Sequence, residues 1–512
     1  MLLHSHSGFL AAAFVYPAIL LGAAAPSSAE ILAAGSISTL SDSSGSEAVI
    51  LWNELGRFRQ SRSEIDEAEQ AFRRALELDE RLGAPSKLET AVVLNNLGTI
   101  AIARHDYAAA EAWFRRSYIL LSEHHLLETP TAGSVLSNLA LDLQQQARYT
   151  EAKPFYERAF TAFRAARQES SLEFAKLLIN AGELSLETGD FRDAVEKHRR
   201  AVAIEDALPS IPAYDLAYAL NRLASALGRT DGLEEARALL QRASDLVADR
   251  AASAQSAKLR VEIVNNLSGV ERRSGHLPGA HEHAQEALRL ASRELAPGDA
   301  LWAGLWNNLG MIALAEKDLR AAKDYYEKSA AAALEVSGRS SARYAAALSN
   351  LATIEAQQGR RGRAQSLWTT ALAIDEARLG PEHPQVASDL SNLAAEAFYA
   401  KKYREAIGLY QRAAAIQERS LGEQNRQMAA TWRNLAIAYH SAKQYRDAQA
   451  AYARAIHAFE ISAGPGSLDL LDCLKRNADV LRKLDRFAEA EQTEVRATRI
   501  EVENAIRAGK QS

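Results

Sequence analysis

The sequence is poor in residues that interrupt helices and in residues that cross-link chains. Its 512 residues include one cysteine, 12 prolines and 27 glycines. The single cysteine, Cys473, excludes an intrachain disulfide, and its place in a helical pattern predicts a buried small hydrophobe. A basic excess is also absent, because the formal net charge is −5, and this argues against a nucleic-acid partner. Strong helix formers dominate the composition instead.

Long apolar runs are missing as well, apart from one near the N-terminus. Residues 9–25 read FLAAAFVYPAILLGAAA, and small residues follow up to Ala29. This arrangement is typical of a signal peptide, here residues 1–29, with the Ser-, Ala- and Gly-rich residues 30–47 as a flexible leader. We therefore expect an exported protein, periplasmic or extracellular, with no stable membrane span after cleavage. The alternative is a membrane anchor formed by residues 9–25.

An alanine recurs along the chain at a nearly constant spacing. We call it the marker alanine, and its positions are Ala68, Ala110, Ala152, Ala194, Ala236, Ala280, Ala322, Ala364, Ala406, Ala448 and Ala490. Each step is 42 residues, except that the step from Ala236 to Ala280 is 44. A fixed period of this size is typical of a solenoid of helical hairpins.

The period predicts an all-α fold. We expect a right-handed α-α superhelical solenoid of about eleven helical hairpins. Repeats 1–5 occupy residues 48–250, repeats 6–11 occupy residues 251–505, and residues 506–512 form a C-terminal tail. The longer step predicts a bend near residues 250–280 between the two groups of repeats.

Inside one repeat, the apolar spacing predicts two helices and a short turn. In the second repeat these are about Leu88 to Arg104 and about Tyr107 to Glu123. The sites twelve residues before and seven residues after the marker alanine hold Gly, Ala or Ser in all eleven repeats. Such small residues let neighbouring helices approach each other closely. An aromatic residue or leucine stands four residues after most markers, and looser packing is expected where His198, Ala284 or Glu494 replaces it.

Two short stretches link these repeats to a known family. Residues 390–394 read LSNLA in a first helix, and residues 379–384 read LGPEHP in a linker. In these stretches and in its 42-residue period, the chain resembles the tetratricopeptide repeat of kinesin light chain and its bacterial relatives, over about residues 48–505. The resemblance implies that first helices line a concave groove in which a protein or peptide partner binds.

An asparagine stands fourteen residues before the marker alanine in eight repeats. These candidate peptide-binding residues are Asn96, Asn138, Asn180, Asn266, Asn308, Asn350, Asn392 and Asn434. An asparagine side chain offers one acceptor and two donors, so a column of them is suited to pair with the backbone of an extended peptide. The resemblance to kinesin light chain implies that this asparagine belongs to the cargo groove.

The alternative is that the asparagines bond across the seam between adjacent repeats, since buried polar groups need partners. Both interpretations stay open, and they are not exclusive. The neighbouring groove sites, such as Asn95, Asn307 and Ser349, are small and neutral. They favour a groove that reads a peptide backbone over a clamp for terminal carboxylates.

Motifs for catalysis, metals or cofactors are not found in the sequence. His281 and His283 lie two residues apart and do not share a helical face, which favours a solvated pair over a metal site. No phosphate-binding loop, zinc-protease motif or nucleophile elbow occurs. We therefore expect no enzyme activity, no cofactor and no metal.

The function expected from the sequence is that of a protein-protein interaction scaffold. Its partner is a protein or an extended peptide in the concave groove. One alternative is an architectural or self-assembling envelope protein, in which the apolar residues Val495 and Ile500 of the last helix dock a second copy. A cytoplasmic regulatory array is the other alternative, if the N-terminal segment is not a signal.

Overall fold

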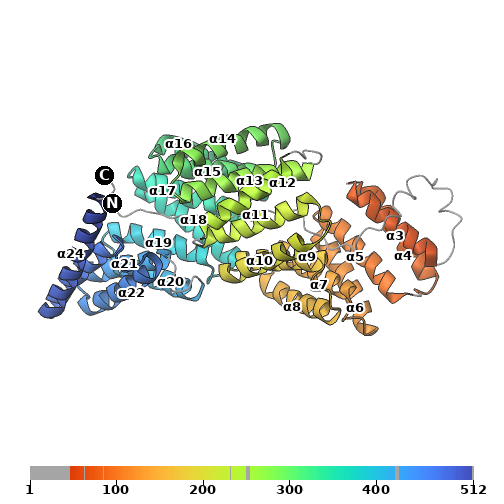
Figure 1. The fold of residues 1–512 in the computed structure, drawn as a ribbon, viewed down its shortest axis with the longest axis horizontal. Helices are drawn as coiled ribbons and strands as arrows, with labels where there is room; N and C mark the ends of the chain where they lie inside the picture. Colours follow the sequence, from red (N-terminus) through yellow and green to blue (C-terminus); the bar gives the residue numbers. More distant parts are fainter. Residues whose placement is uncertain are drawn as a thin grey trace. The chain divides into compact units, whose positions relative to one another are not determined.

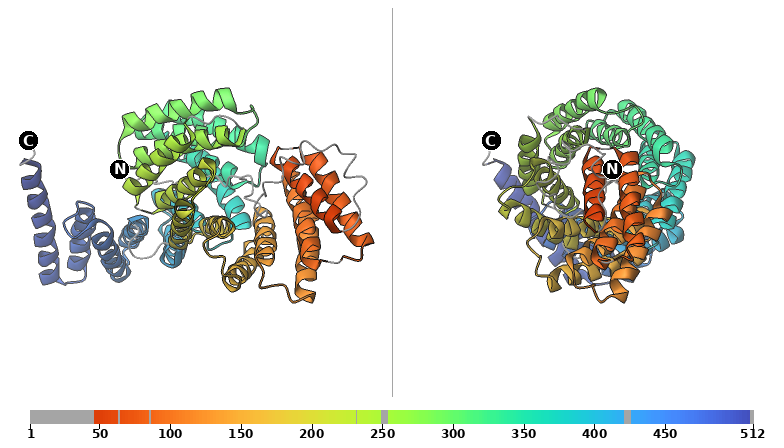
Figure 2. Two further views of the ribbon diagram at one scale, coloured as in Figure 1. Left: turned by 45° about the vertical axis from the view of Figure 1, so that its right-hand side comes forward. Right: turned by 90° about the vertical axis from the view of Figure 1, so that its right-hand side faces the viewer.

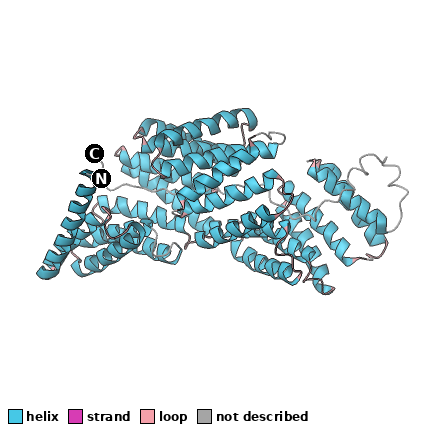
Figure 3. Cartoon of the chain, in the orientation of Figure 1, coloured by secondary structure: helices cyan, strands magenta, loops and turns pink. Residues whose placement is uncertain are grey.

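The structure is a computed structural model that describes residues 46–62, 64–84, 86–230, 232–248, 254–420 and 426–509. The predicted signal peptide, the leader up to residue 45 and the last three residues of the predicted tail lie outside the described residues. Every regular element in the described ranges is a helix (Figure 3). None of the helices in these ranges combines the length and the apolar character that a membrane span requires.

The described residues form 22 helices that pair into consecutive hairpins (Figure 1). The helices are α3 (Ser46–Ser61), α4 (Ile65–Arg81), α5 (Lys87–Ala103), α6 (Tyr107–Glu123), α7 (Pro130–Gln145), α8 (Tyr149–Ala165), α9 (Leu172–Glu187), α10 (Phe191–Ala207), α11 (Ala213–Arg229), α12 (Leu233–Val247), α13 (Ala254–Arg273), α14 (Leu277–Glu294), α15 (Leu301–Ala315), α16 (Leu319–Ser337), α17 (Ala342–Gln357), α18 (Arg361–Leu379), α19 (Pro384–Tyr399), α20 (Tyr403–Ser420), α21 (Arg426–Ser441), α22 (Tyr445–Ala463), α23 (Leu470–Lys483) and α24 (Phe487–Gly509). The predicted all-α solenoid is confirmed, and each odd-numbered helix is the first helix of its repeat.

The chain divides into two compact units. In the described residues, the N-terminal unit comprises residues 46–186 and 193–223, and the C-terminal unit comprises residues 187–192 and 224–509. In the C-terminal unit, consecutive helices follow one another along a curve, from green through blue in Figure 2. The division predicted after residue 250 and the bend near it stay predictions, because residues 249–253 lie outside the described part.

Capping residues explain where the helices of a hairpin begin and end. In the second repeat, the Ser86 side chain accepts a hydrogen bond from the Glu89 amide at the start of α5, and the Asp106 side chain caps α6 in the same way. The turn residue between them, His105, has a φ of 59°. The same turn position, five residues before the marker alanine, has positive φ in nine repeats, at His105, Ala147, Gly189, Gly275, Lys317, Gly359, Lys401, Lys443 and Asp485.

A large side chain of the second helix packs on a small residue of the first helix. A Cβ atom placed on Gly56 would lie 2.5 Å from the Phe72 ring, and one on Gly310 would lie 2.6 Å from the Tyr326 ring. The small residues seven positions after the marker alanine are buried in all eleven repeats. The sequence therefore predicted the packing register of the hairpins correctly.

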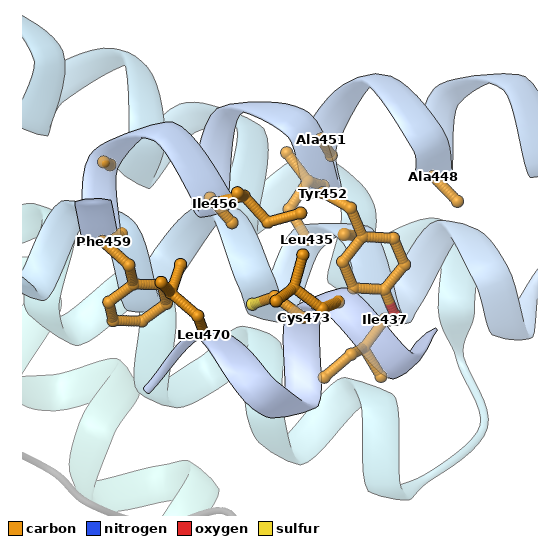
Figure 4. Packing of buried hydrophobic residues seen from close by; sticks show 14 of the residues in the cluster. Leu435, Ile437, Ala448, Ala451, Tyr452, Ile456, Phe459, Leu470 and Cys473 are labelled. Atoms are coloured by element: carbon orange, nitrogen blue, oxygen red, sulfur yellow. The ribbon is translucent and has the colours of Figure 1, made fainter. Parts of the chain in front are cut away.

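Cys473 lies in the core between the tenth and eleventh repeats, next to Leu435, Tyr452 and Leu470 (Figure 4). Its side chain is fully buried, and burial raises the pKa of the thiol to about 12. The protonated thiol is a poor nucleophile. The prediction that this residue is a buried small hydrophobe is therefore confirmed.

Ion pairs join the second helices of consecutive repeats on the outer surface. Arg116 contacts Glu80 at 2.6 Å, and Arg454 contacts Glu418 at 2.6 Å. The arginine stands six residues after one marker alanine, and the glutamate stands twelve residues after the previous one. These side chains are exposed, so each pair contributes at most about 1 kcal/mol. The pairs align neighbouring repeats more than they stabilise them.

The last helix presents a polar face where another repeat would stack. Glu494 and Glu501 stand at positions that hold aromatic or apolar residues in most other repeats, and they pair with Arg482 and Lys475. A polar outer face is typical of the end of a repeat array. The expectation that Ile500 is exposed was wrong, because its side chain is only 4% exposed in the packing of the last hairpin. Val495 is exposed, and docking of a second copy there stays a prediction.

Candidate peptide-binding face

The first helices lie closer together than the second helices do. In the N-terminal unit α3 contacts α5 and α5 contacts α7, and in the C-terminal unit α13 contacts α15 and α19 contacts α21. Second helices of consecutive repeats approach less closely among the described helices. Within each unit the first helices are therefore on the inner side of the curve, where the sequence predicted the groove.

Most of the predicted binding asparagines are buried in the seam between repeats. The Asn96 amide donates a hydrogen bond to the Asn53 side chain at 2.8 Å, and the Asn138 amide donates to Asn95 at 2.9 Å. The Asn350 amide donates to Asn307 at 2.7 Å. We call this arrangement the amide seam. It supports the seam interpretation for these residues, and a role in ligand binding stays a prediction.

Asn308 forms three hydrogen bonds in the amide seam. Its amide donates to the Asn265 carbonyl at 3.0 Å, to the Asn265 side chain at 3.2 Å and to the Ser268 hydroxyl at 3.1 Å. Asn180 and Asn266 are also buried, at 5% and 8% exposure. A substitution at any of these sites therefore perturbs the packing of repeats as well as any ligand contact.

The acceptor of the amide seam belongs to a second column of residues. In each bond between two asparagines, the donor stands fourteen residues before one marker alanine, and the acceptor stands fifteen residues before the previous one. The acceptors Asn95, Asn265 and Asn307 were identified in the sequence only as small groove residues, and Asn53 was not identified at all. The bonded asparagines are 43 residues apart in every pair, and this constant spacing in the sequence could have indicated the pairing.

The last two asparagines of the column lack this bond. The residues in the acceptor position are Ser349 for Asn392 and Ser391 for Asn434. The Ser349 hydroxyl donates to Asp389 at 3.0 Å, and the Ser391 hydroxyl donates to the Ala387 carbonyl at 2.8 Å. Asn392 and Asn434 are half-buried. Their side chains are therefore more exposed than those of the other six asparagines, and their contact with a ligand stays a prediction.

The seam between the fourth and fifth repeats contains ionisable groups in place of amides. Arg222 stands at the asparagine position, and the acceptor position holds Ile179. The Arg222 guanidinium is 3.8 Å from the Glu183 carboxylate and lies 5.1 Å from the centre of the Tyr218 ring. Burial raises the pKa of Glu183, and Arg222 opposes that shift. We call this group the ionic seam.

His198 completes the ionic seam from the second helix of the fourth repeat. Its side chain is fully buried over Gly182, so the looser packing expected at this position was wrong. The ring nitrogen Nε2 lies 3.5 Å from Glu183. Burial, together with the charges of Arg222 and Lys197, lowers the pKa of His198 to about 3. The ring is therefore neutral at ordinary pH and replaces an aromatic residue.

A cavity opens on the first-helix face of the N-terminal unit. Its volume is about 210 Å³. The lining residues are Val92, Asn95 and Asn96 of α5, Pro130, Thr131 and Ser134 of α7, Phe163 of α8, Gln168 and Ser171 of the following linker, and Glu173 of α9. Apolar atoms and neutral hydroxyl and amide groups make up most of this lining. We call it the first-helix pocket.

The histidine pair of the sixth repeat contacts separate partners. His281 Nδ1 lies 3.3 Å from Glu316, and His283 Nδ1 lies 3.4 Å from Glu271. The two rings therefore do not converge on one point. Across the described ranges, no group of three or more His, Cys, Asp or Glu side chains is arranged to hold a metal ion.

Comparison with protein families matches these hairpins to a single repeat type. The model of the tetratricopeptide repeat matches residues 46–121, 131–206, 303–377, 343–419, 394–461 and 427–500. The matched segments cover more than half of the chain and lie on both sides of residues 207–302. The chain belongs to the tetratricopeptide repeat family. Its 44-residue step and the Arg222 position both fall within residues 207–302.

Relatives of this tetratricopeptide repeat protein include kinesin light chain homologues. Protein KINESIN LIGHT CHAIN-RELATED 1 of Arabidopsis thaliana is 28% identical over 171 residues. The alignment covers 32% of this chain and 26% of that protein, so the chain spans about a quarter of the length of this relative.

Two solved structures are similar in fold. BtubC (BKLC) of P. vanneervenii is 24% identical, with a TM-score of 0.40, over 45% of this chain and 92% of that chain. A monomeric mutant of IFIT1 with Gppp-AAAA is 16% identical, with a TM-score of 0.46, over 88% of this chain and 90% of that chain. The likeness concerns the helical-hairpin fold and not the ligand.

Proposed function

We propose that this protein is a non-enzymatic scaffold that binds an extended segment of a partner protein on its first-helix face. In the proposed complex, one apolar side chain of the partner occupies the first-helix pocket. The main observation in support of this proposal is the pocket, which combines an apolar interior with neutral hydrogen-bonding groups. Arrays of tetratricopeptide repeats mediate protein-protein interactions in general, and this generality supports the proposal.

Exposed apolar residues on the same face also support the proposal. Ile50 is 44% exposed and stands at the repeat position of Val92 and Ser134. Leu88 is 37% exposed and stands at the repeat position of Pro130. Val92, Ser134 and Pro130 all line the pocket. The apolar surface therefore continues along the first helices, and burial of it contributes binding free energy of about 25 cal/mol per Å².

The chemistry of the pocket favours a neutral segment of the partner. Glu173 is the one charged residue of the lining, and the remaining polar groups are hydroxyls and amides. Neutral donors and acceptors pair with a peptide backbone whatever its side chains are. The apolar interior then selects the side chain that enters it. This combination is typical of small pockets that fix orientation with a few polar groups.

The test uses a defined probe, a displayed library of random linear peptides selected on the full chain. A matched pair of variants decides the result. Ser134→Trp fills the pocket, whereas Ala430→Trp places the same ring at the same repeat position of the tenth repeat, away from the pocket lining. We expect selected peptides to lose about tenfold or more in affinity with Ser134→Trp, a change of about 1.4 kcal/mol. Affinity should be unchanged with Ala430→Trp.

Equal binding of the selected peptides to both tryptophan variants and to the wild type would contradict the pocket assignment. Melting curves of the three proteins serve as the control for folding. Asn392→Ala combined with Asn434→Ala tests the predicted asparagine contacts separately. We expect this double variant to weaken peptides that bind the first-helix face of the C-terminal unit, with no change in the melting curve.

We also propose that the protein is exported, periplasmic or extracellular. The support is the apolar run of residues 9–25 followed by small residues up to Ala29. Mass spectrometry of the N-terminal peptide of the protein from its native source tests this proposal. A mature N-terminus at Glu30 is the expected result, and an intact residue 1–29 segment would favour the anchor.

A further inference from the structure

Two aspartates meet in the interior between the eighth and ninth repeats. Asp375 lies in the last third of α18, and Asp389 lies in the first half of α19. Their side chains are 1% and 0% exposed. The position of Asp375, eleven residues after the marker alanine, holds an apolar side chain in the second, third and tenth repeats, at Leu121, Phe163 and Phe459. The same position holds a buried acid in the first and fourth repeats, at Asp79 and Glu205, so what distinguishes this junction is the second carboxyl, Asp389, seventeen residues before its marker alanine.

Few donors reach this pair. The Ser349 hydroxyl donates to one oxygen of Asp389 at 3.0 Å, and the Gln385 side chain also bonds to Asp389. The second oxygen of Asp389 and both oxygens of Asp375 meet no N–H or hydroxyl donor among the described residues. The carboxyl of Asp375 is in hydrogen-bonding contact with that of Asp389. The remaining partner of each carboxyl is thus the other carboxyl.

The surrounding charges do not neutralise the pair. Arg378, on the same helix as Asp375, is the cation that faces Asp375, and Glu376 is an anion that faces Asp389. No ion pair joins either aspartate to a cation within the described ranges. Two carboxylates in hydrogen-bonding contact in a buried site cannot both be ionised at low cost. One of the two groups therefore retains its proton and donates it to the other.

We propose that the junction of α18 with α19 is a pH-sensitive joint. One proton shared between Asp375 and Asp389 holds the eighth repeat against the ninth, and loss of this proton loosens their packing. The effect extends to α17, because Ser349 donates to Asp389 while its carbonyl accepts a hydrogen bond from the Trp368 indole at 3.1 Å. Three helices thus meet at the shared proton. The joint lies in the C-terminal unit and does not depend on the proposed peptide binding.

The direction of the effect follows from burial. Burial, and for Asp375 also the Asp389 charge, raises the pKa of both carboxyls above the ordinary range. The unfolded chain loses its protons near the ordinary value, whereas the folded junction retains one proton to higher pH. The stabilisation is therefore complete in acid and is lost as the pH rises through the pKa of the folded pair. Alkaline conditions loosen the joint, and acid conditions tighten it.

The first repeat contains a matched junction. Asp79 stands at the same repeat position as Asp375 and is equally buried, at 1% exposure. Its carboxylate accepts a hydrogen bond from the Thr90 hydroxyl at 2.6 Å. Val93 stands at the repeat position of Asp389, so no second carboxyl meets Asp79 from that position. The junction of α4 with α5 is therefore the internal control for the junction of α18 with α19.

Hydrogen exchange of the full chain, read by mass spectrometry of peptides, tests the joint. Exchange is measured from about pH 6 to about pH 9 and corrected for the intrinsic dependence of exchange on pH. We expect the protection of peptides from α18 and α19 against exchange to fall about tenfold or more over this range. One pKa unit corresponds to a tenfold change in an equilibrium constant. Peptides from α4 and α5 should change less.

The variant Asp375→Asn keeps the shape of the protonated carboxyl and supplies an amide that donates to Asp389 at every pH. Its α18 and α19 peptides should stay protected up to about pH 9. Asp389→Asn supplies the donor from the opposite side and gives the same expectation if the first variant does not fold. Protection in the wild type that does not change with pH, or an equal change in wild type and variants, overturns the proposal.

Discussion

The amide seam between the seventh and eighth repeats and the ionic seam between the fourth and fifth repeats occupy the same repeat positions. At the first seam, the Asn350 amide donates to Asn307. At the second seam, Arg222 replaces the donor, Ile179 replaces the acceptor, and Glu183 supplies the oxygen that Ile179 lacks. The comparison teaches that a donor at the asparagine position can pair with an acceptor at another position of the preceding first helix, since Glu183 stands four residues after Ile179.

The two seams differ in what happens when one member is lost. A neutral amide pair leaves one unsatisfied polar group, whereas a buried ion pair leaves an uncompensated charge. The ionic seam also contains His198, whose ring must stay neutral because the site is closed to water. The amide seam has no ionisable member at the bonded positions. The stability of the ionic seam therefore depends on pH. The bonded asparagines of the amide seam give it no pH dependence.

The largest effect is expected from Arg222→Met. This change leaves the half-buried Glu183 without its cation and removes the contact of the buried Arg222 side chain with Tyr218. We expect a loss of about 3–5 kcal/mol in the free energy of unfolding near neutral pH, measured by urea denaturation. The loss should shrink towards acid pH, because burial raises the pKa of Glu183 and a protonated carboxyl needs no cation.

A triple variant sharpens this test by converting the ionic seam into the amide seam. Ile179→Asn, Glu183→Met and Arg222→Asn reproduce the residues Asn307, Met311 and Asn350 at the equivalent positions. We expect the triple variant to be more stable than Arg222→Met. A triple variant no more stable than Arg222→Met would show that the two seams are not interchangeable.

An intermediate effect is expected from Asn350→Ala. The substitution leaves the buried Asn307 side chain without its donor, so the free energy of unfolding should fall by about 1–3 kcal/mol. Asn392→Ala is the matched control, because its side chain is half-buried and makes no seam bond with Ser349. We expect a change of about 0.5 kcal/mol or less for the control. Equal losses for the two variants would contradict the acceptor rule of the amide seam.

A smaller, pH-dependent effect is expected from His198→Phe. This change gives the fourth repeat the phenylalanine that the second repeat has at the same position, Phe114. Burial lowers the pKa of His198 from its ordinary 6.5 to about 3, so the folded protein binds fewer protons than the unfolded chain between these values. The wild type should lose about 2 kcal/mol at this site between about pH 8 and about pH 5, and the variant should not. Thermal melts at both pH values measure the difference, and parallel shifts of the two proteins would refute the neutral-histidine assignment.

Much of the fold was predictable from the sequence because the repeat makes each structural requirement visible many times. The small residues over which rings pack, such as Gly56 beneath Phe72, recur at fixed distances from the marker alanine. The helix bounds of the second repeat agreed to within one residue at each end with the spacing of its apolar residues. Local periodicity therefore specifies both the hairpin and its stacking.

The candidate site was predicted less completely. The sequence identified the asparagine column but not its partner column, because a bond between residues 43 positions apart is visible only once neighbouring repeats are placed side by side. The first-helix pocket was not predicted, since it combines residues of three repeats with a linker. The sequence also did not distinguish Asn392 and Asn434 from their buried counterparts. A serine at the acceptor position does not mark them, because Ser137 holds that position for Asn180, which is buried.

The sequence by itself determined the repeat, the hairpin, the small-residue packing sites and the family, because these depend on residues close together in the chain. Only the tertiary structure decided which asparagines serve the seam, where a pocket opens and which buried acids meet. These outcomes depend on side chains from different repeats, whose distances are set by helix packing and not by spacing along the chain. Asp375 and Asp389 show the difference, since each is an ordinary acidic residue in the sequence and only their burial together makes them share a proton.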